Sequence, residues 1–98
     1  MAKIAVLGYG TVGSGVVEVL ETNKDSITKR AGREIEVKSV LDLRDFPGDP
    51  IQEKIVHDVD VIINDPEIEV VVEVMGGVEP AFTFVKRALE AGKSVCTS

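Results

Sequence analysis

The fold of this chain is decided near its N-terminus by the stretch Lys3-Ile4-Ala5-Val6-Leu7-Gly8-Tyr9-Gly10-Thr11-Val12-Gly13. It begins with a short apolar run, which is typical of a strand buried on both faces of a parallel sheet. Three glycines follow with the spacing Gly-x-Gly-x-x-Gly. Apolar residues then recur at helical spacing, at Val12, Val16, Val19 and Leu20. The periodicity therefore changes from strand to helix across a glycine-rich turn.

Each of the three glycines has a physical role if this turn binds a dinucleotide. Gly8 makes the tight turn, Gly10 lets the backbone approach a pyrophosphate, and Gly13 lets the helix pack closely on the strand. The pyrophosphate then lies on the N–H groups and the positive dipole end of the helix that begins at Thr11-Val12. Glycines at this spacing also occur in plain strand–helix turns, so the interpretation depends on their position between a strand and a helix.

Downstream of this turn, strands and helices continue to alternate. We predict strands over 35–42, 68–74 and 94–97, a first helix through about residue 23 with an extension toward Gly32, and a last helix from Pro80 to the closing Gly92. Such alternation is typical of an α/β fold, a Rossmann-type parallel sheet with helices on both faces. We expect an incomplete sheet of about four strands in the order 3-2-1-4, with 94–97 at an edge.

The segment Val59-Asp60-Val61-Ile62-Ile63 fits two structures. Its β-branched side chains favour a strand, but Asp58 can cap a short helix, and Asp65-Pro66 ends whichever element precedes it. The residues alone leave both structures open.

Composition and charge exclude several classes of function. The 98 residues make one domain or part of one, and their net charge of −6 argues against nucleic acids and anionic membranes as partners, because both require a basic surface. No apolar run is long enough to span a membrane, and no signal peptide is recognisable. One cysteine and one histidine cannot build a disulfide or a zinc site, so we expect no metal and a cytoplasmic location.

Asp42 is the candidate for binding the adenosine ribose. It ends the second predicted strand, where a dinucleotide-binding domain places the carboxylate that accepts the ribose hydroxyls. Its separation from Gly8 is longer than the usual spacing of about 20 residues, so a solvated acid at a strand end is the alternative. Arg44 lies two residues further on and suits a 2′-phosphate, so these residues leave NAD and NADP both open.

Three further positions carry residue types with a possible functional role. Met75-Gly76-Gly77 follows the third predicted strand at the sheet end where ligands collect, so its backbone either lies close to a cofactor or only makes a turn. Cys96 is expected to be a buried, inert thiol, because no histidine lies near it in the sequence. His57 is expected to be solvated or to cap a turn.

Four stretches together resemble the N-terminal cofactor-binding domain of homoserine dehydrogenase. They are Ile4 to Gly15, Asp65 to Gly77, Glu79 to Ala81, and Ala88 to Ser98. The resemblance covers the whole chain and is much more specific than the glycine motif alone. In that family a short helix precedes the Asp-Pro block, so the resemblance predicts a helix for the ambiguous segment 59–63.

The resemblance implies an NAD(P)-dependent oxidoreductase that reduces aspartate 4-semialdehyde to homoserine, in threonine and methionine biosynthesis. In the family the last strand continues into an Asn-Lys pair, whose lysine reaches the active site. Residues 1–98 contain neither that lysine nor the substrate domain. We therefore interpret the chain as one NAD(P)-binding domain, a fragment without catalytic residues that is inactive alone. Its expected partners are the dinucleotide, the missing C-terminal substrate domain and other copies in a homo-oligomer.

Matched residue by residue, the resemblance implies a cofactor site alone. The pyrophosphate would lie against Tyr9, Gly10, Thr11, Val12 and Gly13, the ribose against Asp42 and Arg44, and the nicotinamide side against Met75, Gly76, Gly77 and Thr97. Many members carry an Arg-Asp pair after the second strand, present here as Arg44-Asp45 with Asp42 just upstream. A carboxylate at a strand end repels a 2′-phosphate more than an exposed arginine attracts it, so NAD is favoured without excluding NADP.

Two other functions remain open from the sequence. One is another nicotinamide oxidoreductase with the same domain, such as the glucose–fructose oxidoreductase or dihydrodipicolinate reductase groups. Members of the first group usually continue the last strand into Glu-Lys-Pro, which Thr97-Ser98 does not match. The other is a ligand-sensing Rossmann module without enzymatic activity.

Overall fold

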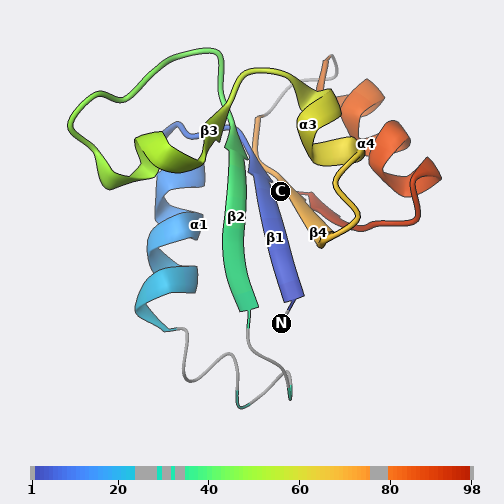
Figure 1. The fold of residues 1–98 in the computed structure, drawn as a ribbon, viewed down its shortest axis with the longest axis horizontal. Helices are drawn as coiled ribbons and strands as arrows, with labels where there is room; N and C mark the ends of the chain where they lie inside the picture. Colours follow the sequence, from blue (N-terminus) through green and yellow to red (C-terminus); the bar gives the residue numbers. More distant parts are fainter. Residues whose placement is uncertain (1, 24–28, 30–31, 33–34, 76–79, 98) are drawn as a thin grey trace.

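The structure is a computed structural model, and it describes the chain except for residues 1, 24–28, 30–31, 33–34, 76–79 and 98. The described part contains one parallel sheet of five strands in the order β3-β2-β1-β4-β5 (Figure 1). The strands are β1 (Ala2–Leu7), β2 (Ile35–Leu41), β3 (Ile55–Val56), β4 (Ile68–Glu73) and β5 (Ser94–Thr97). The predicted Rossmann-type α/β fold is confirmed.

Helices lie on both faces of this sheet, as predicted (Figure 1). They are α1 (Thr11–Thr22), the 3₁₀ helix η1 (Pro50–Lys54), α3 (Val59–Ile63) and α4 (Ala81–Glu90). On one face, α1 and η1 contribute Val17 and Ile51 to a cluster with Val6 of β1. On the other face, Ile62 of α3 and Ala88 of α4 join a second cluster around β1 and β4. The central strand β1 is therefore buried from both sides.

The strand order differs from the predicted one in one respect. Of the four predicted strands, the third (68–74) was expected beside the second, but β4 lies beside β1. The place next to β2 is taken by β3, a two-residue strand that the sequence analysis missed because two residues show no periodicity. The prediction that the last strand lies at an edge of the sheet is confirmed.

The helix ends agree with most of the sequence signals. The short helix of the ambiguous segment is confirmed, and the Asp58 side chain caps it by accepting a hydrogen bond from the Asp60 N–H at 2.9 Å. Pro80 was expected as the first helical residue, but it is the N-cap of α4. Gly92 closes that helix with a φ of 84°, and Gly32 also has a left-handed φ, of 71°. The predicted extension toward Gly32 falls largely outside the described residues.

Cys96 is exposed, so the expectation of a buried thiol is wrong. Its neighbour Val95 packs against the cluster formed by α3 and α4. Because side chains alternate along a strand, Cys96 points to the opposite face of β5. In the described sheet the strand has only β4 beside it, so β5 is also an edge strand.

A buried lysine ties the start of β4 to the start of β5. Lys93 is 8% exposed, and its ammonium group donates hydrogen bonds of 2.7 Å to the backbone carbonyls of both Asp65 and Ile68. The aliphatic part of the side chain lies in the interior while the charge is paired with carbonyl oxygens. Lys93 thereby fixes the turn that leads into β4 against the residue that precedes β5.

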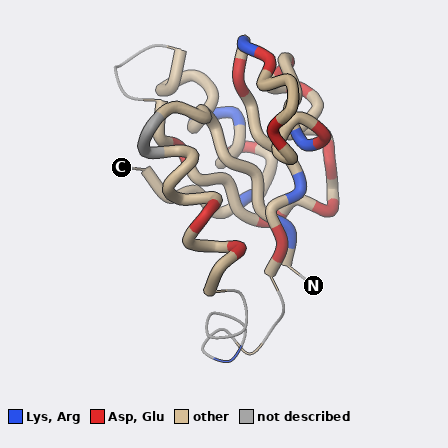
Figure 2. The backbone as a smooth tube through the Cα atoms, turned by 90° about the vertical axis from the view of Figure 1, so that its left-hand side faces the viewer, with Lys and Arg blue, Asp and Glu red and all other residues tan. Residues whose placement is uncertain are grey.

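Acidic positions lie along α1 in the tube view (Figure 2), and the two acidic residues of this helix, Glu18 and Glu21, are exposed. Several opposite charges are paired at the amino-terminal end of the sheet. Lys38 lies 2.5 Å from an Asp65 oxygen and 3.3 Å from Glu67, and Glu67 also pairs with Lys3. In the part of the chain that the structure describes, none of the helices has the length and apolar character needed to cross a bilayer.

Candidate functional site

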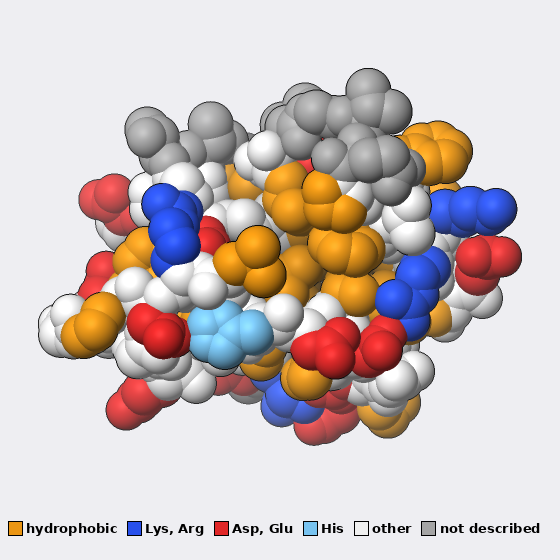
Figure 3. Space-filling view, turned by 90° about the horizontal axis from the view of Figure 1, so that it is seen from above, with side chains coloured by type: hydrophobic (Ala, Val, Ile, Leu, Met, Phe, Trp, Pro, Cys, Tyr) orange, Lys and Arg blue, Asp and Glu red, His pale blue; other side chains and the backbone are white. Residues whose placement is uncertain are grey.

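A cleft of about 500 Å³ opens at the carboxyl ends of β1, β2 and β4. Its lining consists of Gly8, Tyr9, Gly10, Leu41, Asp42, Leu43, Arg44, His57, Val59, Val74, Met75, Pro80 and Phe84. Figure 3 looks onto this end of the molecule, where apolar side chains lie between charged groups and the pale blue histidine. In open α/β sheets, ligands bind at this end, where strand order reverses.

The glycine loop shapes the middle of the cleft. Gly8 has a φ of 104° and donates its N–H to the Leu41 carbonyl at 2.7 Å, so the turn needs the left-handed conformation that glycine adopts without strain. A Cβ added to Gly13 would lie 2.0 Å from the Gly8 carbonyl oxygen. The roles assigned to these two glycines, the tight turn and the close packing of helix on strand, fit this geometry.

Gly10 leaves space for a ligand in front of α1. A Cβ added to Gly10 would meet no other atom within 4 Å. Gly10 is the N-cap of α1 and has no side-chain capping bond. The N–H groups of a first helical turn have no partner within the helix, and they carry the positive end of its dipole. An anionic group fits this place by charge and by space.

Asp42 lies immediately after β2 and is held by four hydrogen bonds. Oδ2 accepts bonds of 3.0 Å from the Tyr9 N–H and from Nη2 of Arg44, and Oδ1 accepts from the Arg44 backbone N–H at 2.9 Å and from Nε at 3.0 Å. These bonds, above all those from the Arg44 guanidinium, lower the pKa of Asp42 to about 2. The residue joins the end of β2 to the glycine loop through Tyr9.

Arg44 and Asp42 form one unit rather than two alternatives. The Arg44 side chain is 64% exposed, whereas that of Asp42 is 10% exposed. The guanidinium carbon lies 5.3 Å from the centre of the Phe46 ring, and that ring meets Tyr9 edge-on with centroids 5.0 Å apart. Arg44 is therefore oriented by a carboxylate and an aromatic face at the rim of the cleft.

His57 is a wall residue that the sequence analysis did not place in the site. One ring nitrogen, Nδ1, lies 2.8 Å from the Asp42 carbonyl oxygen, and Nε2 lies 2.9 Å from an Asp45 carboxylate oxygen. The side chain is half exposed, in keeping with a partly solvated residue. Its position follows β3, and because that strand has no sequence signal, nothing in the sequence indicated its proximity to Asp42.

The other predicted residues are distributed as follows. One cleft is lined by five of the predicted residues: Tyr9, Gly10, Asp42, Arg44 and Met75. Thr11 and Val12 open α1 beside it, and Gly13 lies behind Gly8. Thr97 pairs with Glu73 in the sheet and is not among the lining residues. Gly76 and Gly77 lie outside the described residues.

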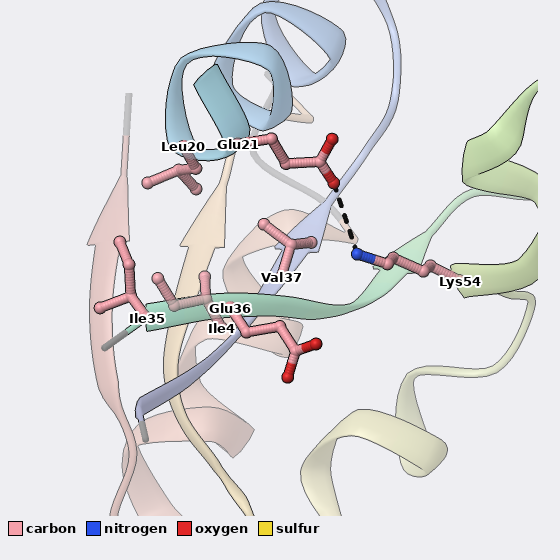
Figure 4. Close-up of a pocket in the computed structure, with 7 residues that line it drawn as sticks. All are labelled: Ile4, Leu20, Glu21, Ile35, Glu36, Val37 and Lys54. Carbon is pink, nitrogen blue, oxygen red and sulfur yellow. Dashed lines mark hydrogen bonds and ion pairs between the residues drawn. The ribbon is translucent and has the colours of Figure 1, made fainter. Parts of the chain in front are cut away.

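A second hollow, of about 230 Å³, lies toward the amino-terminal ends of β1 and β2 (Figure 4). Ile4, Leu20, Ile35 and Val37 give it apolar walls. Glu21 of α1 and Lys54 of η1 form an ion pair of 3.4 Å across it. It contains none of the predicted site residues, and Ile4, Ile35 and Val37 in its walls belong to the buried core.

Comparison with known proteins shows the family of the chain that forms this cleft. The family described as "Homoserine dehydrogenase, NAD binding domain" matches residues 8–98, which is nearly the whole chain. The chain belongs to this family. The homoserine dehydrogenase of Pseudomonas aeruginosa is 42% identical over 97 residues, and that of Lactococcus lactis is 38% identical over 102 residues. The alignments cover 98% of this chain but only 22% and 24% of these two enzymes.

Solved structures agree with the sequence comparison. Homoserine dehydrogenase from S. aureus at pH 7.0 superposes with a TM-score of 0.88 and 37% identity, covering 99% of this chain and 26% of that one. The enzyme from Thiobacillus denitrificans also gives 0.88, with 38% identity, and covers 98% of this chain and 23% of that one. The chain thus spans about a quarter of the length of the homoserine dehydrogenases it matches.

Proposed function

We propose that residues 1–98 form the NAD(P)-binding domain of a homoserine dehydrogenase that interconverts aspartate 4-semialdehyde and homoserine, on the route to threonine and methionine. The observation that supports this proposal most strongly is the open space at Gly10, in front of the N-terminus of α1, in a chain whose family is an NAD-binding domain. The proposal includes a cytoplasmic location and a homo-oligomer.

The described residues fit a dinucleotide in one orientation. The glycine loop and the first turn of α1 would hold the pyrophosphate, and Asp42 with Arg44 would hold the adenosine ribose. The nicotinamide would lie toward Met75, and contacts of Gly76, Gly77 and Thr97 with it stay predictions from the family resemblance. Bound nicotinamide supplies hydride chemistry. The contribution of this domain is to hold the ring in place, while the proposed substrate domain binds the aldehyde and provides the proton.

Binding of the ribose requires Arg44 to move. A carboxylate offers about four acceptor positions, and the four bonds to Asp42 occupy them. Ribose hydroxyls can be accepted only where the two guanidinium bonds are given up, and the Arg44 side chain, which is 64% exposed, has solvent to turn into. Released from Asp42, the guanidinium is available to a 2′-phosphate. We propose that NAD is preferred and NADP is also bound, since the carboxylate still opposes the phosphate.

A calorimetric titration tests the proposal. The wild-type chain should bind NAD and NADP, whereas Gly10→Ala should weaken both at least tenfold, because its methyl group occupies ligand space. The variant should stay folded with a slightly lower unfolding temperature, since alanine is a poorer N-cap than glycine. Gly15→Ala is the matched control, since it adds the same methyl group to α1 where no atom lies within 4 Å, away from the cleft lining. Binding equal in Gly10→Ala and Gly15→Ala, or no binding by the wild type, would contradict the proposal.

Asp42→Ala tests the assignment of the ribose. The ratio of the two dissociation constants should move toward NADP, because the variant loses the acceptor for the hydroxyls and the charge that opposes the phosphate. Tighter binding of NADP than of NAD by the wild type, with a ratio unchanged in Asp42→Ala, would show that Asp42 does not contact the ribose.

A further inference from the structure

A buried carboxylate lies on the β4 side of the cleft. Glu73, the last residue of β4, is only 6% exposed. Glutamate is almost never fully buried unless it is paired. Here Oε1 accepts a hydrogen bond of 2.7 Å from the Met75 backbone N–H. A bond from an amide to a carboxylate is among the stronger ones, so it restrains the backbone at Met75.

Met75 in turn lies against the glycine loop. A Cβ added to Gly8 would lie 3.2 Å from the Met75 Cγ, 3.5 Å from its Cα and 3.6 Å from its backbone nitrogen. The residue between, Val74, donates its N–H to the Leu7 carbonyl at 3.2 Å. The backbone that leaves β4 is therefore held by β1 and Gly8 on one side and by the Glu73 side chain on the other.

The two ends of the cleft can bind different parts of a dinucleotide. Asp42 and Arg44 line the β2 end, Met75 and Phe84 line the end formed by β4 and α4, and Gly10 lies between them. If the ribose lies at Asp42 and the pyrophosphate at the glycine loop, the nicotinamide extends toward Met75. This placement rests on the proposed function.

We propose that Glu73 is a positioning residue: its bond to the Met75 amide fixes the β4 wall of the cleft against Gly8 and thereby sets the place of the nicotinamide ring. Glu73 does not touch the cofactor in this proposal. Its effect is confined to the nicotinamide half, because the adenosine half is held by Asp42 and the glycine loop.

Comparison of two ligands tests the proposal. NAD carries the nicotinamide, whereas ADP-ribose carries the same adenosine and pyrophosphate without it. Glu73→Met keeps the length of the side chain and suits a buried site but removes the acceptor. We expect it to raise the dissociation constant of NAD about tenfold while that of ADP-ribose changes by less than about twofold. Glu73→Gln keeps an acceptor oxygen and should restore NAD binding to within about threefold of wild type.

Glu69→Gln, on the exposed surface of the same strand, is the control for loss of one negative charge. It should leave both ligands unaffected. Equal weakening of NAD and ADP-ribose in Glu73→Met would show a general structural role and overturn the proposal, and so would unchanged binding of both. If the wild type binds neither ligand, the proposed function fails with it.

Hydrogen exchange gives a second measurement that does not need the Met variant to fold. In the wild type, the Met75 amide should be protected, and NAD should increase its protection more than ADP-ribose does. Equal protection by saturating NAD and ADP-ribose would overturn the proposal.

Discussion

Gly13→Ala should destabilise the fold although it replaces glycine by the best helix former. The new Cβ would lie 2.0 Å from the Gly8 carbonyl oxygen, 2.8 Å from the Gly8 carbonyl carbon and 3.3 Å from Cγ2 of Val74. Real Cβ atoms essentially never come closer than 3.0 Å to such neighbours. Two of the three atoms belong to backbone that is fixed by the bond from the Gly8 N–H to Leu41. The start of α1 must therefore move away from β1 by about an ångström or more.

The magnitude follows from two opposing contributions. Inserting a methyl group into a packed site costs about 1–3 kcal/mol, and a clash with backbone belongs at the upper end of that range. Alanine recovers up to about 1 kcal/mol of helix propensity over glycine. We expect a net loss of about 2 kcal/mol, which is a large share of the roughly 5–15 kcal/mol that stabilises a typical domain.

Gly15→Ala in the same helix provides the control, because its Cβ would meet no atom within 4 Å. It gains the propensity without the clash, so it should stabilise the chain by about 0.5–1 kcal/mol. Urea unfolding followed by circular dichroism measures the stability changes of Gly13→Ala and Gly15→Ala. The midpoint of unfolding should move, while the dependence of the free energy of unfolding on urea concentration should stay unchanged. If Gly13→Ala is as stable as Gly15→Ala, then the close contact between the helix and the Gly8 turn is not present in solution, and the reasoning is refuted.

Other predictions concern Asp42, Arg44, catalysis and the sheet edge. The folded-state pKa of Asp42 is about 2, below its ordinary value, so the unfolded chain binds a proton here more readily than the folded chain. The free energy of unfolding of the wild type, relative to that of Asp42→Asn, should therefore fall by up to about 2 kcal/mol between pH 5 and pH 2, as measured by urea unfolding. Arg44→Ala should tighten NAD and weaken NADP in calorimetry, because it frees two acceptor positions on Asp42 and removes the cation; parallel changes in both would contradict this. The chain alone should show no turnover of homoserine with NAD or NADP, and activity that survives repurification in proportion to protein would contradict this. Light scattering should show self-association with rising concentration through the edge of β5, and a strict monomer would disprove it.

The parts of the fold predicted from the sequence are those with local causes. The change of period at the glycine loop, the cap at Asp58 and the glycine at 92 each act within a few residues. Asp42 was expected at the end of the second strand, and it lies directly after β2 in the lining of the cleft, while its contact with a ribose stays a prediction. The glycine loop is the clearest example, because one short stretch determines both the backbone conformation and the space for a ligand.

The features that escaped prediction depend on contacts distant in the chain. The two-residue β3 forms only because β2 offers an open edge, and His57 reaches the Asp42 carbonyl only because β3 is there. The registers of β1 with β2 and with β4 both shift near Ile4, so alternation along one strand does not predict the facing residue on the next. The bond from Arg44 to Asp42 was not foreseen, because either residue alone suits the ribose region.

Cys96 has a practical consequence for anyone who works with this protein. It is the only cysteine in the chain, and its thiol is accessible on the face of β5 opposite α3 and α4. A maleimide dye therefore attaches at a single known position without any engineered substitution. The rate of that reaction reports directly on whether another surface, from the same polypeptide or from a second molecule, has come to cover this side of the sheet.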